Sequence, residues 1–291
     1  MNLSRRAALI GASAIFAASA AQAQNFPTRP VRLIVPIAPG GANDIIARMI
    51  AERLAPVLGQ PVVVENRPGA GGNLGALAVA QAEKDGHTLL FTSANVLVAN
   101  KYLYRTQMPL DPMRDLAPIT RVAVGSILLV VNSQRPYRTL GELIEFARAN
   151  PGRVTMGSSG TIDMMFDAIP ALLPHVREGR FRPLVVGSAQ RITYVPEIAN
   201  VPGMDEALPG KGFDALNWWS VVAPAGTPAP VINTLHAALT RVMADEALAA
   251  RLRPMSFQPT TDATPAAFGE FWRAQEPIWR DLVQQSGATA E

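Results

Sequence analysis

The chain has 291 residues, of which 26 are basic, 23 are acidic and three are histidines. It contains no cysteine, which excludes disulfides and thiolate metal sites. The charges are mixed along the chain without a basic tract, and the histidines are far apart, so we expect no nucleic-acid partner, no metal and no other cofactor.

The first 23 residues are predicted to be a signal peptide. Arg5 and Arg6 precede an uncharged run from Ala7 to Ala20, and Ala21-Gln22-Ala23 forms a cleavage site. The run is shorter than the ~20 residues that span a bilayer. Its length and its flanking residues favour a signal peptide over a retained membrane anchor or a buried helix. No later stretch is a candidate span, because prolines, glycines and charges interrupt the apolar runs. We therefore expect an exported protein, by either the Sec or the Tat route.

The mature chain begins with a strand, a glycine turn and a helix. Val31 to Val35 is short, apolar and valine-rich, which is typical of a buried strand. Gly40 and Gly41 form the turn, and the helix is expected to begin near Asn43 as N-cap, with Asp44 in its first turn. Its apolar face repeats at every fourth residue, and Gly59 is placed to end it.

Similar units recur along the chain and predict a parallel sheet covered by helices on both faces. Further strands are expected at 62–65, 88–92, 127–131, 153–156, 163–167, 183–187 and 216–223. Further helices are expected after the glycines at 69–75 as far as Asp85-Gly86, at 139–149, at 228–244, and at 264–285 with an interruption at Pro277.

Polar or glycine-rich turns follow several of these strands, at 38–43, 69–73, 92–95 and 157–160. In open α/β sheets, ligands bind at the carboxyl edge where such turns lie. Helix N-termini also present free N–H groups and a partial positive charge there. This edge is therefore predicted to hold a carboxylate or a phosphate.

Several catalytic interpretations are weak. The glycines at 69, 71, 72 and 75 do not match G-x-G-x-x-G, and G-K-[ST] is absent. Ser158 and Ser159 suggest a nucleophile loop, but G-x-S-x-G is missing and no histidine is placed to act as a base. Trp218 and Trp219 are expected to pack where the chain crosses between domains. The residues favour an exported α/β protein that binds an anion.

Longer stretches resemble a known family. "PVRLIVPIAPGGANDIIARMIAERLAPVLGQPVVVENRPGAGGNLGALAVAQAEKDGHTLLFTS", "GELIEFARANPGRVTMGSSG", "MFDAIPALLPHVREGRFRPLVV" and "VVAPAGTPAPVINTLHAAL" are similar to segments of the Bug-type receptors, in the same order. These receptors are the periplasmic solute-binding proteins of tripartite tricarboxylate transporters. The resemblance implies a type II-like clamshell of two lobes, each a mainly parallel sheet flanked by helices. Lobe 1 would comprise 24–122 and 222–291, and lobe 2 would comprise 123–221.

The resemblance also implies a function and a site. A monomeric receptor, not an enzyme, would close around a small carboxylate and deliver it to a membrane permease. The implied ligand-binding residues in lobe 1 are Ala38, Pro39, Gly40, Gly41, Asn43, Asp44, Gly71, Gly72, Asn73, Thr92 and Ser93. Those in lobe 2 are Ser158, Ser159, Gly160 and Asp167. Asn43 replaces the small hydroxyl residue that is usual in the family.

One departure from the family pattern is large. After "GSSG" the family continues through about one crossover unit, on the order of 30 residues, before its "MFD" strand. Here "TIDMMFD" follows almost directly. Parallel neighbouring strands need a connection of a dozen or more residues, so the short link allows only a hairpin, one bent strand or strands that are not adjacent. Lobe 2 is therefore expected to be truncated after Gly160.

Two alternatives to a working receptor remain. One is an exported hydrolase-like enzyme that uses Ser158 and Ser159. The other is a degenerate family member that binds nothing, because the truncation removes part of one cleft wall.

Overall fold

The computed structural model describes residues 26–290 apart from 105–107, 156–162, 213 and 215. The predicted signal peptide, residues 1–23, lies outside the described residues. The chain divides into two compact units. Unit 1 contains residues up to Val122, Trp219–Leu248 and Thr260–Glu291, and unit 2 contains Ala123–Trp218 and Ala249–Pro259.

The sheet of unit 1 is built around β1, the first predicted strand. β1 pairs in parallel with β2 on one side and with β3 on the other, and β3 then pairs antiparallel with β7. These strands are β1 (Val31–Val35), β2 (Val62–Asn66), β3 (Thr88–Ser93) and β7 (Leu216–Pro224). The parallel βαβ pattern predicted for β1 to β3 is confirmed. The antiparallel strand, β7, comes from much later in the chain.

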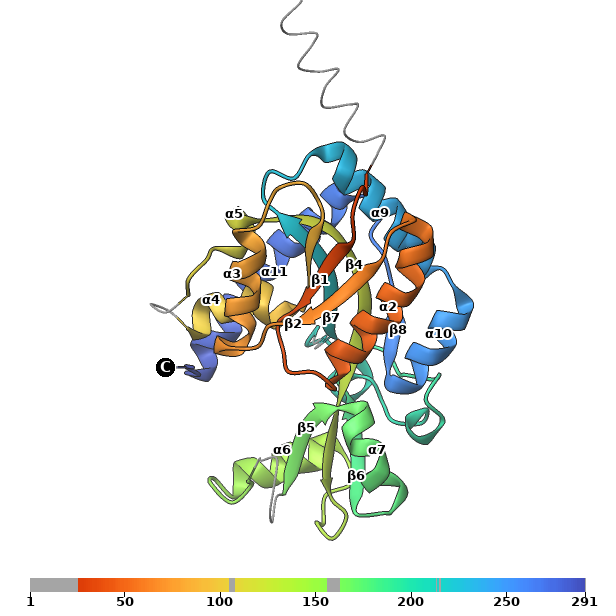
Figure 1. Cartoon of the computed structure of the whole chain (residues 1–291). Helices are drawn as coiled ribbons and strands as arrows, with labels where there is room; N and C mark the ends of the chain where they lie inside the picture. Colours follow the sequence, from red (N-terminus) through yellow and green to blue (C-terminus); the bar gives the residue numbers. More distant parts are fainter. Residues whose placement is uncertain (1–25, 105–107, 156–162, 213, 215, 291) are drawn as a thin grey trace, which may run out of the picture. The chain divides into compact units, whose positions relative to one another are not determined.

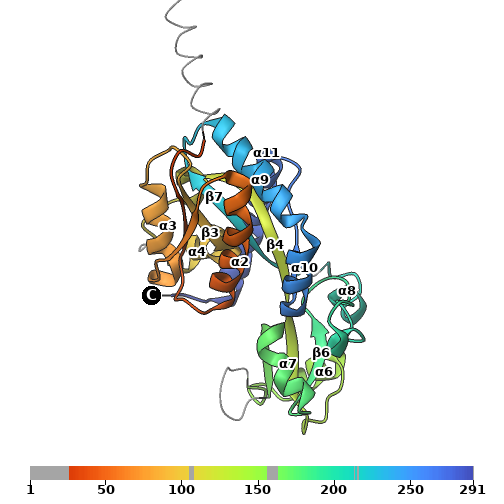
Figure 2. The same ribbon diagram turned by 45° about the vertical axis from the view of Figure 1, so that its right-hand side comes forward.

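Helices cover this sheet on opposite faces (Figures 1 and 2). α2 (Ala42–Leu58) connects β1 to β2, and α3 (Asn73–Ala80) connects β2 to β3 on the other side of β1. Right-handed crossovers in opposite directions place the two helices on opposite faces. α3 ends at Ala80, earlier than predicted. Beside α2 lies α9 (Ala229–Met243).

The apolar periodicity of α2 accounts for its packing. Ile46, Ile50 and Leu54 are fully buried, at most 1% exposed, whereas the neighbouring Ile45 is 40% exposed. The C-cap is Gly59 in the left-handed conformation, as predicted. The buried face therefore follows the i, i+4 series and excludes Ile45.

α11 (Pro265–Ser286) packs on the opposite side of unit 1 from α2. The rings of Phe268 and Trp272 are stacked with centroids 5.9 Å apart, and both are buried. The predicted interruption at Pro277 is wrong, because the helix runs through that residue and is anchored by its buried first half.

Shorter elements of unit 1 are η1 (Ala70–Gly72), the π-helix η2 (Asn95–Ala99), α4 (Asn100–Leu103) and α5 (Pro112–Asp115).

β4 (Leu116–Asn132) is a long strand that continues from unit 1 into unit 2. In unit 2 it pairs with β5 (Met164–Ala168), β6 (Phe181–Val186) and β8 (Phe257–Pro259), and all three pairings are antiparallel. The prediction of a mainly parallel second sheet is therefore wrong for the described pairs. β5 and β6 do run in the same direction, joined by α7 (Ile169–Arg177), but β4 lies between them and runs the opposite way.

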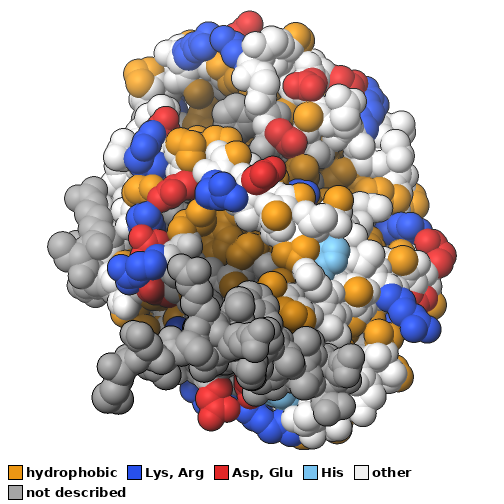
Figure 3. Space-filling view, turned by 90° about the horizontal axis from the view of Figure 1, so that it is seen from above, with side chains coloured by type: hydrophobic (Ala, Val, Ile, Leu, Met, Phe, Trp, Pro, Cys, Tyr) orange, Lys and Arg blue, Asp and Glu red, His pale blue; other side chains and the backbone are white. Residues whose placement is uncertain are grey.

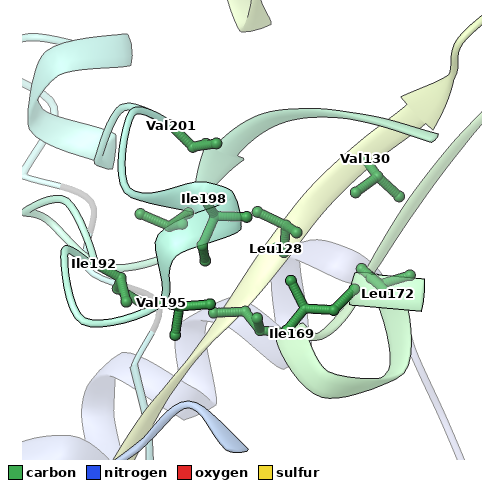
Figure 4. Packing of buried hydrophobic residues seen from close by; sticks show 10 residues of the cluster. Leu128, Val130, Ile169, Leu172, Ile192, Val195, Ile198 and Val201 are labelled. Carbon is green, nitrogen blue, oxygen red and sulfur yellow. The ribbon is translucent and has the colours of Figure 1, made fainter. Parts of the chain in front are cut away.

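Alternate side chains of β4 fill two separate cores in unit 2. Leu128 and Val130 pack against α7 and the segment from Ile192 to Val201 (Figure 4). Leu129 and Val131 point to the other face, which α6 (Leu140–Ala149) covers. A strand buried on both faces explains the continuous apolar run in the sequence. The remaining elements are η4 (Pro196–Ile198), α8 (Met204–Ala207), α10 (Glu246–Leu252) and η5 (Arg253–Met255).

The predicted strand at 153–156 is not formed over its described residues, and Met156 lies outside them. Instead the carbonyl oxygen of Thr155 accepts hydrogen bonds from the N–H groups of Asp163 and Met164, at 3.1 and 3.2 Å. The side chain of Asp163 accepts from the Thr155 N–H and hydroxyl. Thr155 and Asp163 are therefore hydrogen-bonded to each other, although neither belongs to a pair of parallel strands, which agrees with the short link between them.

Basic and acidic side chains are interspersed over the described part of the face in Figure 3. The mixed charge along the sequence thus remains mixed on this surface, which gives little long-range steering. Within the described residues, no helix combines the length and the hydropathy needed to cross a membrane.

We expect Leu172→Ala to destabilise unit 2. Leu172 is 1% exposed and packs in the core of Figure 4, so truncation removes buried apolar surface and leaves a cavity. The expected loss is about 2–5 kcal/mol of unfolding free energy, measured by urea denaturation. Leu282→Ala is the matched control, because Leu282 is 46% exposed, and it should change stability by no more than ~0.5 kcal/mol. Equal effects of the two substitutions would contradict the assigned core.

Candidate functional site

Three parallel strands of unit 1 end at the same edge of the sheet. β1, β2 and β3 all run in one direction, and the helices α2 and α3 begin beyond this edge (Figure 1). The turn Ala38–Gly41 follows β1, the glycine loop Gly69–Gly72 follows β2, and Thr92 and Ser93 end β3. The predicted residues of lobe 1 are therefore brought to one edge, where the positive ends of two helix dipoles also lie.

The first turn of α2 differs from the prediction. Its N-cap is Gly41, with extended backbone angles and no side-chain cap, and the carbonyl of Gly41 accepts from the Ile45 N–H at 3.0 Å. Asn43 is therefore not the N-cap but lies within the first turn. Its side chain is free for another contact, because the cap requires only the carbonyl of Gly41.

Asp44 is the hydrogen-bonding centre of this turn. Its side chain is only 5% exposed. One oxygen, Oδ2, accepts from the Gly40 N–H at 2.9 Å and from Arg48 Nε at 3.1 Å. The other, Oδ1, accepts from Asn66 Nδ2 at 2.9 Å and lies 3.0 Å from a terminal nitrogen of Arg48. The carboxylate is thus fully occupied by protein donors.

Asn66 extends the network to the preceding turn. Its Nδ2 also donates to the carbonyl of Ile37 at 3.2 Å, and its Oδ1 accepts from Arg48 at 3.0 Å. Sequence reasoning missed Asn66 and Arg48. No local sequence signal marks them, because their place in the network depends on the register in which Asn66, the last residue of β2, pairs with Val35, the last residue of β1.

The electrostatics of Asp44 follow from these contacts. Burial by itself raises the pKa of Asp44, whereas hydrogen bonds from Arg48 and from the Gly40 N–H lower it. Asn66 lowers it further, and the net pKa lies below the ordinary value for an aspartate. Asp44 therefore remains charged at neutral pH, and it braces the turn rather than offering a free group to an anion.

The side chain of Asn43 contacts a residue far along the chain. Its Oδ1 accepts from the indole Nε1 of Trp219 at 2.6 Å. Trp219 is 7% exposed and lies on β7 opposite Ser93. Both tryptophans are buried as predicted, and the division between the two units falls between Trp218 and Trp219. The hydrogen bond to Asn43 was not predicted.

The glycine loop after β2 is shaped by close packing. Gly72 has φ +99°, and a Cβ there would come within 2.7 Å of Val96. A Cβ on Gly75, in the first turn of α3, would come within 2.7 Å of Pro36 and 2.8 Å of the Arg67 carbonyl. These glycines allow the start of α3 to lie directly against the end of β1.

Asn73 has a structural role within the described residues. It is fully buried, and its Oδ1 accepts from Asn100 Nδ2 at 2.7 Å. The same amide of Asn100 donates to the Gly71 carbonyl at 3.0 Å, which ties the glycine loop to α4. The predicted loop residues from Gly71 to Asn73 are thus anchored to α4 by the side chain of Asn100.

Thr92 and Ser93 are both buried at the end of β3. Thr92 pairs in register with Ser220 on β7, and both hydroxyl groups are fully buried without a hydrogen-bond partner among the described atoms. Sequence reasoning missed Ser220. Two unpartnered hydroxyls side by side form a polar site within an otherwise apolar sheet.

The predicted residues of the second lobe are only partly described. Ser158, Ser159 and Gly160 lie outside the described residues. Asp167 lies on β5 in unit 2, where its Oδ1 accepts from the N–H of Ala168 at 2.6 Å. Among the described residues, no group of three or more His, Cys, Asp or Glu side chains could hold a metal ion.

Comparisons with known proteins assign the family. The sequence profile described as "Tripartite tricarboxylate transporter family receptor" matches residues 46–163 and 159–286. The chain belongs to this family. BugT of Bordetella pertussis is 31% identical over 99% of each chain, and a protein from the tcbD-tcbE intergenic region of a Pseudomonas species is 30% identical over 97% of this chain and 94% of the relative.

Solved structures agree with the family assignment. The periplasmic binding protein BugD is similar with a TM-score of 0.75 at 27% identity, covering 91% of this chain and 99% of BugD. A Rhodopseudomonas palustris protein solved with adipate has a TM-score of 0.77 at 27% identity, with coverage of 91% and 99%. MatC from the same organism, with bound malate, has a TM-score of 0.72 at 27% identity, with coverage of 89% and 100%.

These findings settle the class of the protein. It has the α/β periplasmic-binding-protein fold, and it is a periplasmic solute-binding receptor. The family consists of binding receptors without enzymatic activity. The family assignment therefore contradicts the alternative of a hydrolase-like enzyme.

We expect Asp44→Asn to destabilise the receptor by about 2 kcal/mol at pH 7, because an amide would face three donors that now meet a carboxylate. The folded pKa of Asp44 lies below the unfolded value of about 3.9. Its contribution is therefore present above the unfolded pKa and is lost as the pH falls through the folded pKa. The variant should thus differ less from the parent protein in acid than at pH 7.

Urea denaturation at a series of pH values measures this difference. Asp281→Asn is the control, because Asp281 is half exposed and pairs only with the exposed Arg280 among the described residues. It should be nearly neutral at every pH. A loss for Asp44→Asn that stays constant into acid would refute the role of its charge.

Proposed function

We propose that the protein binds a small carboxylate and delivers it to the membrane permease of a tripartite tricarboxylate transporter, by closure of two lobes. The observation that carries this proposal is the edge of unit 1 where β1, β2 and β3 end and α2 and α3 begin. Backbone N–H groups at helix N-termini suit an anion without requiring a cationic side chain. The relatives solved with adipate and with malate support a dicarboxylate as the ligand class.

Within this proposal, the lobe 1 contacts come from the turn Ala38–Gly41 with Asn43, from Gly71 and Gly72, and from the polar end of β3 at Thr92 and Ser93. Asp44 holds the first of these loops in place, because its side chain is already engaged with protein donors. Asn73 Oδ1 accepts from Asn100, whereas its buried Nδ2 has no partner among the described atoms. Ser158, Ser159, Gly160 and Asp167 would contribute from lobe 2. The lobes would rotate about the crossings near Val122–Gly125 and Trp219–Ala223.

We also propose that lobe 2 lacks one crossover unit. The alignment with BugT extends over 328 residues although this chain has 291, so the relative has residues without a counterpart here. The family profile matches in two pieces that meet at residues 159–163, at the short link. Met164, Met165 and Phe166 on β5 are only half-buried, which supports the loss of covering structure beside this strand. Binding would be weakened or altered as a result.

Thermal unfolding of the chain from Gln24, with adipate, malate and a tricarboxylate, tests the proposed function. A ligand that binds only the folded state adds RT ln(1 + [L]/Kd), or about 2.7 kcal/mol at a hundredfold excess over Kd. One acid should raise the melting temperature, and its diamide should not, because it offers the site no anion. A cooperative melt that no acid shifts would favour the degenerate, non-binding alternative. Affinity equal to that of a full-length relative would contradict weakened binding.

A further inference from the structure

The hydrogen bond between Trp219 and Asn43 fixes which end of the Asn43 amide is free. An indole N–H can only donate, so its partner must be the amide oxygen. The two ends of an asparagine amide are otherwise hard to distinguish in a structure, but a donor-only partner decides the orientation. The Nδ2 group, with two protons, must therefore point away from the indole.

The tryptophan is held firmly enough to impose this orientation. Trp219 is buried, and its strand β7 pairs antiparallel with β3 from Leu90 to Ser93. Asn43 lies in the first turn of α2, which the Asp44 network ties to β2. Both ends of the 2.6 Å hydrogen bond are thus fixed by secondary structure within unit 1.

The free end of the amide is available to a ligand. Asn43 Nδ2 makes no hydrogen bond to any described residue, and the side chain is only partly buried. The nearby N–H of Gly40 is not available in the same way, because Asp44 already accepts from it. Asn43 therefore supplies side-chain donors at a turn where one backbone donor is occupied.

We infer that Asn43 is a specificity-determining residue that donates from Nδ2 to a carboxylate oxygen of the ligand, and that Trp219 is the positioning residue that aims it. This inference rests on the proposed function and names a contact in it. A serine or threonine at this position would offer a single rotatable proton, whereas the aimed amide offers two donors and no acceptor. The turn should therefore prefer an ionised carboxylate to a group that must also donate.

A double-mutant cycle measured by isothermal titration with adipate and malate tests the inference. Asn43→Ala should raise the Kd of the bound acid about tenfold, which corresponds to the loss of one charge-assisted hydrogen bond. Trp219→Phe keeps the aromatic ring but removes the donor, and should raise the Kd severalfold. In the Asn43→Ala background, Trp219→Phe should add no further loss, because the tryptophan acts through the asparagine.

Trp272→Phe is the matched control. Trp272 is also a buried tryptophan of unit 1 whose Nε1 donates to a protein acceptor, the carbonyl of Leu97 at 3.3 Å. It should lower the melting temperature and leave the Kd unchanged. A second readout is the chemical shift of the Asn43 side-chain amide in nitrogen-15 NMR. In the parent protein the amide signals should shift when the acid is added. In Trp219→Phe they should move towards the shifts of an amide without a fixed hydrogen bond.

The outcomes separate the inference from the proposed function. If the parent protein binds an acid and Asn43→Ala binds it equally well, the donor role of Asn43 is wrong and the receptor function stands. If the losses from Asn43→Ala and Trp219→Phe simply add, Trp219 is not the positioning residue. If the parent protein folds but binds neither acid, the proposed function and the inference with it are overturned.

Discussion

The buried carboxylate of Asp44 is the interaction on which the candidate site depends. The turn after β1 has two glycines and little apolar contact, so its own residues cannot fix it. Asp44 accepts from Gly40 within the turn, from Arg48 on the next turn of α2 and from Asn66 at the end of β2. One side chain thus joins a loop, a helix and a neighbouring strand. A buried charge with this many donors is stable only if all of them stay in place, which makes the geometry of the turn specific.

The same network affects what the turn can bind. Its negative charge is neutralised by Arg48 and by the hydrogen bonds that it accepts, so the edge of the sheet does not repel an anion as a free carboxylate would. Among the described residues, the remaining backbone N–H groups at the start of α2 and the amide nitrogen of Asn43 have no acceptor. In the proposed function, the site would recognise charge through dipoles and hydrogen bonds, which suits a receptor that must also release its ligand.

The second unit is organised around one strand rather than one loop. β4 provides apolar side chains to two cores on opposite faces, with α7 on one side and α6 on the other. Because β5 and β6 each pair with β4, this part of unit 2 keeps a complete core even though the link after Thr155 is short. The proposed loss of a crossover unit falls beside β5, whose Met165 packs against the core at α7 and whose Met164 and Phe166 pack against the core at α6. It would remove covering structure at the edge of these cores rather than β4 at their centre.

Local sequence patterns determined most of the secondary structure. β1 to β3, α2 with its Gly59 cap, α6 with its Thr139 cap and the C-terminal α11 follow from apolar periodicity and capping residues, which are short-range properties of the chain. The gathering of the turns at one edge of the sheet also followed, because parallel βαβ units place their turns together. The specific family motifs then indicated the class of receptor, which the comparisons confirmed.

Other features were decided only by the tertiary structure. Asn43 is not the helix N-cap, because α2 begins after Gly41. Its side chain instead accepts a hydrogen bond from Trp219, 176 residues away in sequence. Asn66 and Arg48 join the site because β2 lies in register beside β1, and no local pattern encodes that register. The antiparallel pairings of unit 2 depend on the direction from which β4 enters it. Periodicity reports which face of an element is buried, but the partner of each polar side chain depends on segments that are brought together only when the chain folds.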